Sequence, residues 1–408
     1  MAIDEIELRP VSEEEFPAFA RAITRHFGED LREARIPRYR ALTELDRTVG
    51  SFANGEIVAT GLVNSDRMPL PGGAELATAG VTGVGVRATH RRRGLLTAMM
   101  RRMLDQAAER GEPLAALYAT EAPIYGRFGF GAAAPSVRFD VDLKRGGVAQ
   151  PLPLARAVQL VDAGAALAQF PEIFAAARAH YPGLLQRSPA RWDAMYAADD
   201  EEDREGFSAR YHALLPGRGY AAYRIKPAWL DDQLPDSTLR VTELVAIDAD
   251  ASAALWSLLA SVDLVVRLEA PNRPVDDPLP LLLADRFAAR ARLADPMYVR
   301  LVDLPAALSA RRYAVEGSLV LHVTDSFCPR NDGRWRLDGG PDAAACVATD
   351  ERADVALDTA DLAEAFLGGQ RWAALAAAGR VAADDEATLR LADAMFGWHR
   401  LPWNAQIF

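Results

Sequence analysis

Cysteine is nearly absent from this sequence, with Cys328 and Cys346 the only two in 408 residues. Two cysteines are too few for a disulfide framework or a thiolate metal site, and we therefore expect a reduced, cytoplasmic protein. Histidine is also scarce, and its six residues are scattered without the His-x-x-x-His spacing of a metal site. Metal chemistry is therefore not expected.

Long apolar runs and excess positive charge are missing as well. No run approaches the roughly 18 residues that a membrane span needs, and the acidic first residues lack the basic and apolar regions of a signal peptide. The net charge of −11 disfavours nucleic acid and anionic membranes as partners and mildly favours cationic ones. At 408 residues the chain exceeds one ordinary core, which predicts two or three domains.

The stretch Gly80–Gln106 carries the most specific pattern. Small and β-branched residues up to Val86 predict a strand, a basic turn ends at Gly94, and an amphipathic helix follows. The residues predicted for the apolar face of this helix are Leu96, Met99, Met100, Met103 and Leu104. A helix N-terminus offers unbonded N–H groups and partial positive charge, to which Arg91, Arg92 and Arg93 add full charges.

This arrangement predicts a binding site for a phosphorylated anion. A run of arginines can also form a solvated turn, but the glycine and the helix that follows at once favour the anion site. The turn has neither the lysine of a P-loop nor the Gly-x-Gly-x-x-Gly of a Rossmann turn.

The elements expected around this stretch alternate as in an α/β protein. Before residue 145 they are a strand at 6–9, a helix at 13–27, and strands at 48–52, 56–64, 114–119 and 136–143. Beyond a polar boundary near 144–153 they are a strand at 158–161, an alanine-rich helix ending near His180, and strands at 208–214 and 219–225. The acidic run 199–205 is expected to be a solvated loop.

A faint internal repeat follows. A strand at 238–247 and a helix at 251–261 match the order of Gly80–Gln106, but the turn between them holds Asp248 and Asp250 and no arginine. Carboxylates cap helices and repel phosphate, so this copy is expected not to bind the same anion.

From about residue 295 the patterns predict a small α+β domain with one curved sheet. Its expected elements are strands at 297–302, 317–325, 334–337 and 343–349 and helices at 304–312, 359–366, 373–378 and 385–396.

The arginine–glycine turn resembles motif A of the GNAT superfamily of N-acetyltransferases, whose loop holds the pyrophosphate of acetyl-CoA. The segments Thr89–Leu96 and Ala119–Gly131 resemble the enhanced intracellular survival (Eis) acetyltransferases more closely, and the resemblance covers the whole chain. It implies tandem GNAT-type domains of α/β and α+β character, the second degenerate, followed by a sterol-carrier-protein-like α+β domain. The implied boundaries are 1–148, 149–294 and 295–408.

The resemblance also implies which residues bind acetyl-CoA as co-substrate. The backbone of Val84, Gly85 and Val86 would hold the acetyl carbonyl and the pantetheine arm, and Thr120 and Glu121 would flank the cofactor. The residues implied for the pyrophosphate are Arg92, Arg93, Gly94, Leu95, Leu96 and Thr97. At Leu96 the superfamily prefers Gly or Ala. Because the backbone N–H makes the contact, a larger side chain directed into the core is compatible with binding.

Two residues are implied as catalytic. Tyr125 matches the general acid of the family, and a phenol with a pKa of about 10 stays protonated at pH 7 and can protonate a departing thiolate. In Eis-type enzymes the C-terminal carboxylate is the base for the attacking amine, which gives this role to Phe408. For each residue the alternative is a packed position, since Tyr125 lies among aromatic residues and the tail Pro402–Phe408 is apolar.

These implications predict a cytoplasmic N-acetyltransferase that uses acetyl-CoA and acts on primary amines of aminoglycoside-like polycations. Glu29, Asp30 and Glu33 are candidates to line the acceptor pocket, although surface solvation explains each one singly. The alternatives are lysine acetylation of proteins or peptides, a lipid or sterol carrier, and a non-catalytic acyl-CoA-binding protein. The resemblance further implies a homo-oligomer, namely a hexamer.

Overall fold

The computed structural model of the chain describes residues 6–150, 152–196 and 199–408, which form two compact units. The first unit comprises the described part of residues 1–133 together with residues 297–398 and 407–408. The second comprises residues 134–296 and 399–406, apart from those not described. No helix among the described residues has the length and apolar character to cross a membrane.

The first unit begins with a sheet in the order β1-β2-β3-β4-β5-β12, in which only β4 and β5 pair in parallel. Its strands are β1 (Glu7–Arg9), β2 (Gly50–Ala53), β3 (Glu56–Pro69), β4 (Glu75–Val86), β5 (Leu114–Tyr118) and the end of β12 (Ala289–Leu301). Strands β2 and β3 form a hairpin, in which Asn54 and Gly55 both have the positive φ that a tight turn requires.

Strand β4 leaves β5 before it ends. Parallel pairing runs only from Thr78 opposite Leu114 to Gly80 opposite Ala116, whereas the pairing of β4 with β3 continues to Val86. Between these points the β3–β4 register shifts, and Gly83 takes a φ of 61°. This is a β-bulge, which bends the strand and redirects the residues that follow it. The backbone of β4 after the bulge is therefore open on the side of β5.

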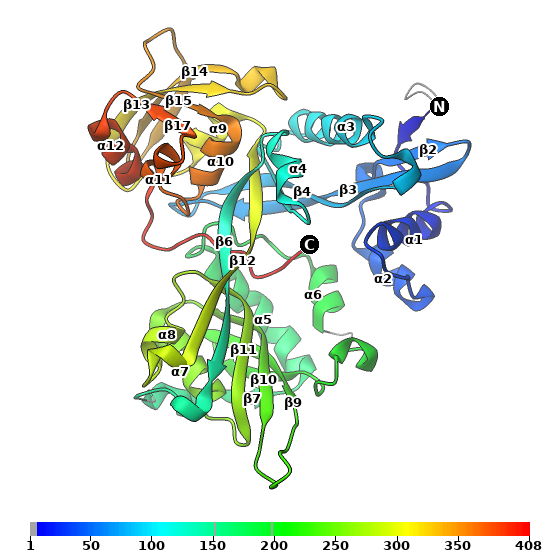
Figure 1. Cartoon of the computed structure of the whole chain (residues 1–408), viewed down its shortest axis with the longest axis vertical. Coiled ribbons are helices and arrows are strands. Elements are labelled where there is room, and N and C mark those ends of the chain that lie inside the picture. Colours follow the sequence, from blue (N-terminus) through cyan, green and yellow to red (C-terminus); the bar gives the residue numbers. More distant parts are fainter. Residues whose placement is uncertain (1–5, 151, 197–198) are drawn as a thin grey trace. The chain divides into compact units, whose positions relative to one another are not determined.

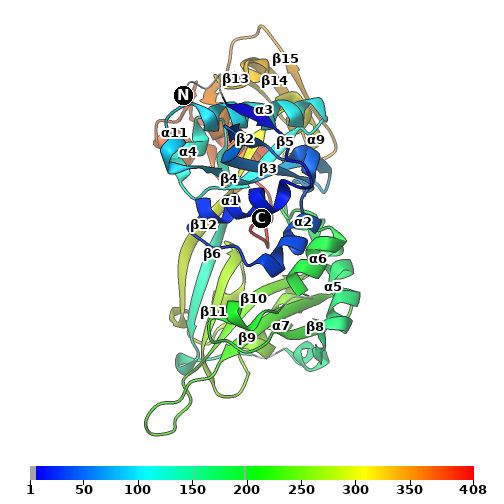
Figure 2. The same cartoon turned by 90° about the vertical axis from the view of Figure 1, so that its right-hand side faces the viewer.

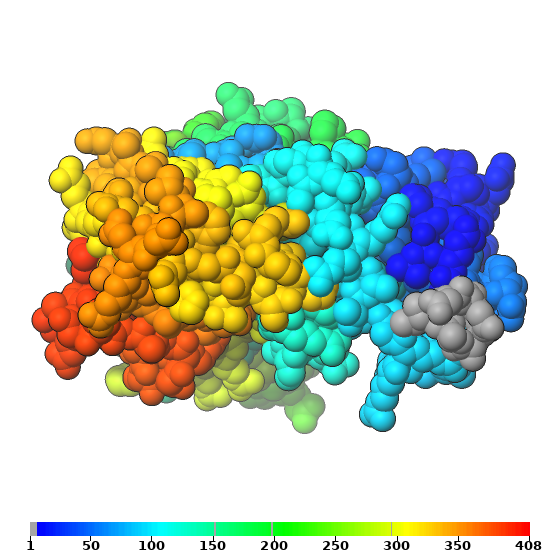
Figure 3. All heavy atoms as spheres, turned by 90° about the horizontal axis from the view of Figure 1, so that it is seen from above, coloured from blue at the N-terminus to red at the C-terminus, as the bar shows by residue number. Residues whose placement is uncertain are grey.

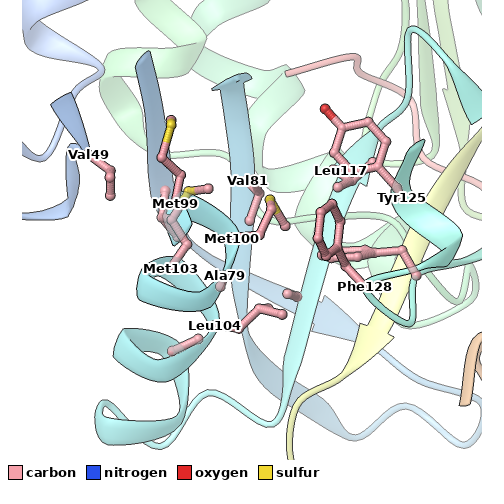
Figure 4. Packing of buried hydrophobic residues seen from close by; sticks show 14 of the residues in the cluster. Val49, Ala79, Val81, Met99, Met100, Met103, Leu104, Leu117, Tyr125 and Phe128 are labelled. Atoms are coloured by element: carbon pink, nitrogen blue, oxygen red, sulfur yellow. The ribbon is translucent and has the colours of Figure 1, made fainter. Parts of the chain in front are cut away.

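Two helices cover opposite faces of this sheet (Figures 1 and 2). Helix α3 (Leu95–Glu109) buries the predicted stripe, with Met99, Met100, Met103 and Leu104 fully enclosed. Figure 4 shows the three methionines beside Ala79 and Val81 of β4. Helix α1 (Phe16–His26) packs Phe16 and Phe19 on the other face. The short helices α2 (Ile36–Ala41) and α4 (Ala122–Gly126) complete this part of the chain.

The predicted stripe includes one further residue. Leu95 is the fully buried leucine of the first turn, and Leu96 is partly buried and packs against the same core, as predicted.

The third domain, which belongs to the first unit, is the predicted α+β domain. Its five-stranded sheet has the order β15-β14-β13-β16-β17. Its elements are β13 (Gly317–Thr324), β14 (Gly333–Gly339), β15 (Ala344–Ala348), β16 (Val355–Asp358), β17 (Val381–Ala383), α9 (Leu304–Ala310), α10 (Thr359–Phe366), α11 (Trp372–Ala377) and α12 (Glu386–Phe396). The short strands β16 and β17 were not predicted. Phe327 joins this domain to the first, because its ring lies 5.0 Å from that of Phe128 and 3.8 Å from the Arg101 guanidinium carbon. Figure 3 shows the yellow and orange atoms of the third domain directly beside the cyan atoms of the first.

The second unit has a sheet in the order β6-β11-β10-β9-β8-β7. Its strands are most of β6 (Gly131–Asp142), then β7 (Gln159–Val161), β8 (Tyr211–Leu215), β9 (Gly219–Lys226), β10 (Ser237–Ala246) and β11 (Val265–Pro274). Its helices are α5 (Ala163–Arg178), α6 (Pro189–Tyr196), α7 (Ala249–Leu259) and α8 (Leu279–Leu282). Helices α5 and α7 pack on opposite faces, because Val245 joins the core beneath α5 and its neighbour Leu244 the core beneath α7. The sequence patterns did not predict α6, β11 or α8.

The predicted internal repeat is confirmed. Strands β10 and β11 pair in parallel around α7, as β4 and β5 do around α3. At the start of α7 the Asp248 carboxylate accepts a hydrogen bond of 2.8 Å from the Ala251 N–H, so the carboxylate caps the helix as expected. Most of the acidic run is exposed as expected, including Glu201, Glu202 and Asp203. Asp199 is partly exposed and accepts hydrogen bonds from the side chain of Arg224 and the backbone N–H of Arg210.

Candidate active site

Within the described residues, the N-terminus of α3 has no side-chain cap and no acidic residue in its first turn. Arg92 and Gly94 take positive φ values of 60° and 81°, and Gly94 is the first boundary residue of the helix. The N–H groups of the first turn are therefore available at the positive end of the helix dipole. The matching end of α7 is closed by Asp248, which also binds Arg218.

A cleft of about 740 Å³ connects this helix end to the open part of β4. It brings together all predicted cofactor-binding residues except Arg93, together with Tyr125. These lining residues are Val84, Gly85, Val86, Arg92, Gly94, Leu95, Leu96, Thr97, Thr120, Glu121 and Tyr125. Arg93 instead donates a hydrogen bond of 3.0 Å to the backbone carbonyl of Thr89. The cleft therefore joins an uncapped helix end, an open strand edge and a phenol.

Tyr125 lies in α4, where only 7% of it is exposed. Its ring meets Phe130 edge-on with centroids 6.3 Å apart. Figure 4 shows its hydroxyl pointing away from Phe128 at the edge of the core. Burial, helped by the negative charge of Glu121, raises the pKa of Tyr125 above its usual value of 10. The side chain is therefore a neutral phenol at pH 7 and can donate a proton.

His26, at the end of α1, lines the same cleft and was not predicted from the sequence. Its Nδ1 lies 3.0 Å from the hydroxyl of Thr60, which donates its single proton to the carbonyl of Gly83 at 2.9 Å. Nδ1 must therefore be the donor to Thr60, which leaves the lone pair on Nε2. Burial, and then the charges of Arg87 and Arg91, lower the pKa of His26. A neutral imidazole thus lies directly beside the bulge in β4.

Gly85 allows this placement. A side-chain carbon built on Gly85 would lie 2.5 Å from ring atoms of His26. No sequence pattern pointed to His26, because a single histidine on a helix has no second residue at the spacing of a catalytic or metal-binding motif.

Phe408 is packed near the end of β5. Its ring meets the ring of Tyr118 at 76° with centroids 5.5 Å apart. It also lies over Gly80, where a built side-chain carbon would come 3.3 Å from the Phe408 ring and would collide with the Asp66 carboxylate. Asp66 is 8% exposed, so a buried carboxylate shares this corner with Phe408. Phe408 itself does not line the cleft of about 740 Å³.

The acidic residues suggested for the acceptor lie elsewhere. Glu29, Asp30 and Glu33 do not line the cleft. Glu33 instead forms a salt bridge of 2.7 Å with Arg21. Across the described residues, no group of three His, Cys, Asp or Glu side chains is arranged to hold a metal ion.

Known protein families match each part of the chain. Two family models described as "Acetyltransferase (GNAT) domain" match residues 7–133 and 183–301. A family model described as "Sterol carrier protein domain" matches residues 304–405. The two GNAT-type domains and the third domain expected from the sequence are therefore confirmed.

Two relatives align with almost the whole chain. An uncharacterized N-acetyltransferase of Streptomyces coelicolor is 39% identical, over 98% of this chain and 98% of the relative. The N-acetyltransferase Eis of Mycobacterium tuberculosis is 35% identical, over 94% of this chain and 95% of the relative. The chain belongs to the Eis N-acetyltransferases. As an Eis-family enzyme of the GNAT superfamily it is an acetyltransferase, and acetyltransferases of this superfamily use acetyl-CoA.

Solved structures agree with the Eis assignment. Eis1 of Mycobacterium abscessus is 33% identical and superimposes with a TM-score of 0.86, over 98% of this chain and 100% of Eis1. A GCN5-related N-acetyltransferase of Anabaena variabilis is 20% identical with a TM-score of 0.83, which shows that it shares the fold.

Proposed function

We propose that this Eis-family enzyme binds acetyl-CoA in the cleft of the first domain and acetylates primary amines of aminoglycoside-like polycations. The observation that carries the proposal is the continuity of the cleft, which runs from the uncapped start of α3 along the open edge of β4 to Tyr125. An elongated substrate with an anionic end and a reactive end fits this order of groups.

The residues of the cleft fit acetyl-CoA. The N–H groups of Leu95, Leu96 and Thr97 and the guanidinium of Arg92 would hold the pyrophosphate. The β4 backbone from Val84 to Val86 would pair with the pantetheine arm, because β5 leaves that edge open. Thr120 and Glu121 would flank it. Arg93 is a weaker member of the set, since its side chain is engaged with Thr89.

The proposed chemistry uses one acid and one base. The acceptor nitrogen attacks the thioester carbonyl carbon, and its proton passes to the Phe408 carboxylate, taken here as the C-terminus of the protein. The C–S bond then breaks, and Tyr125 donates its phenolic proton to the departing thiolate. Proton exchange with solvent resets both groups. An ionised carboxylate and a neutral phenol are the required states at pH 7.

For the acceptor we propose a cationic amine. The net charge of −11 favours such a substrate, and the buried Asp66 carboxylate beside Phe408 would attract an ammonium group. Lysine amines of peptides share this chemistry and remain the competing acceptor class. In the third domain Trp372, Phe396 and the buried Arg311 pack together in the core, which weighs against a lipid carrier.

We further propose the domain boundaries 1–148, 149–294 and 295–408, a cytoplasmic location and a homo-oligomeric state, which the family resemblance suggests is a hexamer. The segments 7–133 and 304–405 that match family models fall inside the first and third of these domains.

The test is a single-turnover assay of CoA thiol release, with kanamycin or a lysine peptide as acceptor. We expect rapid release with kanamycin, and in Tyr125→Phe a loss of turnover with acetyl-CoA binding retained, because only the proton donor is removed. Release with the peptide alone would shift the assignment to lysine acetylation. Binding without release from either acceptor would instead indicate an acyl-CoA-binding protein.

A further inference from the structure

In the second domain, β10 and β11 diverge in the same way as β4 and β5. Their parallel pairing ends at Arg240 opposite Glu269, while β10 continues along β9 to Ala246. In the first domain the equivalent opening forms part of the cleft. In the second domain, residues of the chain itself occupy the corresponding opening.

Arg273 of β11 bridges the two strands across this opening. Its Nη1 donates a hydrogen bond of 2.6 Å to the carbonyl of Leu244 on β10, and its Nε donates to Asp277 at 2.8 Å. The guanidinium carbon lies 5.0 Å from the ring centroid of Trp403, which belongs to the C-terminal segment. Trp403 is 1% exposed and packs in the same core as Val245.

The C-terminal segment is held by matched hydrogen bonds. Asn272, next to Arg273 on β11, accepts from the Trp403 indole N–H at 3.1 Å and donates to the carbonyl of Asn404 at 3.0 Å. The side-chain oxygen of Asn404 accepts from the backbone N–H of Leu185 at 3.2 Å. The Asn272 side chain thus forms hydrogen bonds with both a side chain and the backbone of the C-terminal segment. Because one of the two bonds requires an indole N–H, the contact depends on the sequence of this segment.

A buried polar network holds the end of the segment. Arg187 donates from Nε to Gln406 at 2.8 Å and binds Glu243 through its other two nitrogens. Tyr220 also donates to Glu243, at 3.0 Å. Burial by itself raises the pKa of Glu243, but the charge of Arg187 outweighs this and holds the pKa below its usual value. The Arg187 guanidinium is therefore fixed in place for Gln406.

We propose that the second GNAT domain is a receptor for the chain's own C-terminal segment, residues 400–406, which occupies the opening that holds cofactor in the first domain. The ligand it recognises is a peptide with the sequence Pro-Trp-Asn-Ala-Gln, and Asn272 and Arg187 are positioning residues. Phe408 lies two residues after Gln406, so this anchor confines Phe408 to within about 7 Å of Gln406 along the chain. The catalytic consequence rests on the proposed role of Phe408, whereas the binding site does not.

The test uses the full chain with Trp403→Ala, which frees the opening, and a fluorescent peptide of residues 399–408. We expect the peptide to bind this variant at least about tenfold more tightly than the wild-type protein, whose site is occupied by its own tail. A peptide carrying the same Trp403→Ala change is expected not to bind. Equal binding of both peptides, or no binding of either, would overturn the receptor assignment.

Turnover separates this inference from the proposed function. The peptide with a free carboxylate should restore turnover in Trp403→Ala, and its C-terminal amide should bind without restoring it. In two further outcomes both peptides bind, and either neither restores turnover or both restore it equally. Either result would support the peptide-binding site in the second domain and would contradict the proposed role of the Phe408 carboxylate.

A second variant covers the case in which Trp403→Ala does not fold. Asn272→Ala removes two hydrogen bonds to the tail but keeps the packing of Trp403. We expect amide exchange at residues 401–406 to accelerate about tenfold, and kcat to fall with the KM for acetyl-CoA unchanged. The matched control is Arg267→Ala, an exposed position on the same strand. Unchanged exchange in Asn272→Ala would contradict the proposal.

Discussion

The substitution Gly85→Ala tests the contact between Gly85 and His26 in the cleft. The Cβ that this substitution adds would lie 2.5 Å from three atoms of His26, while the backbone at this position is not in the left-handed region. The damage therefore comes from overpacking against the imidazole, which costs about 1–3 kcal/mol. Displacing the ring also breaks its hydrogen bond to Thr60, which is worth about 1 kcal/mol.

The assay is a double-mutant cycle with His26→Gly, read by urea unfolding and by the KM for acetyl-CoA. Gly85→Ala alone should destabilise the protein and raise KM, because the displaced ring moves into the cleft. His26→Gly with Gly85→Ala should recover about 1–3 kcal/mol of coupling, since removing the whole His26 side chain takes away all three atoms that the added methyl would meet. Gly147→Ala is the control, because its added carbon meets its nearest atom at 3.8 Å.

Additive effects of the two substitutions would refute this reasoning. They would mean that the side chain of His26 does not lie on Gly85.

The remaining predictions concern the helix end and the second domain. Gly94→Ala places a side chain at a φ of 81° beside the proposed pyrophosphate site. The left-handed backbone should cost about 1–2 kcal/mol of stability, and titration calorimetry should show acetyl-CoA binding weakened by about tenfold or more. Unaltered affinity would count against the pyrophosphate loop. Asp199 has its pKa lowered to about 2, since hydrogen bonds from Arg224 and Arg210 outweigh the effect of burial. The ionised Asp199 therefore stabilises the fold above about pH 4, and this contribution is lost as pH falls toward about 2. The free energies of unfolding of the wild type and of Asp199→Asn should accordingly converge over that range. A difference that does not depend on pH would disprove the ion pair.

The sequence predicted much of the first domain. The apolar period of α3 and the Arg-Arg-Arg-Gly turn predicted a strand and a helix that the structure contains, because each depends on local spacing. The anion site between them stays a prediction. The bulge at Gly83 was missed, since it depends on the register between β3 and β4, which alternation within one strand does not reveal. His26 was missed for the same reason, because its position depends on packing against Gly85.

The second and third domains were harder to predict. Strands β16 and β17 are short, and β11 ends in Asn-Arg-Pro, so neither length nor alternation distinguished them from loops. The tail was recognised as apolar, but its partner Asn272 lies more than a hundred residues earlier in the chain. No local pattern links residues so far apart, and only the folded structure brings them together.

The most direct test of the central claim is a single turnover with one alanine appended after Phe408. We expect acetyl-CoA to bind as in the wild-type protein and turnover to be lost, because the α-carboxylate is moved by one residue and a neutral amide stands in its place. Full turnover in the extended protein would contradict the assignment of the base to Phe408.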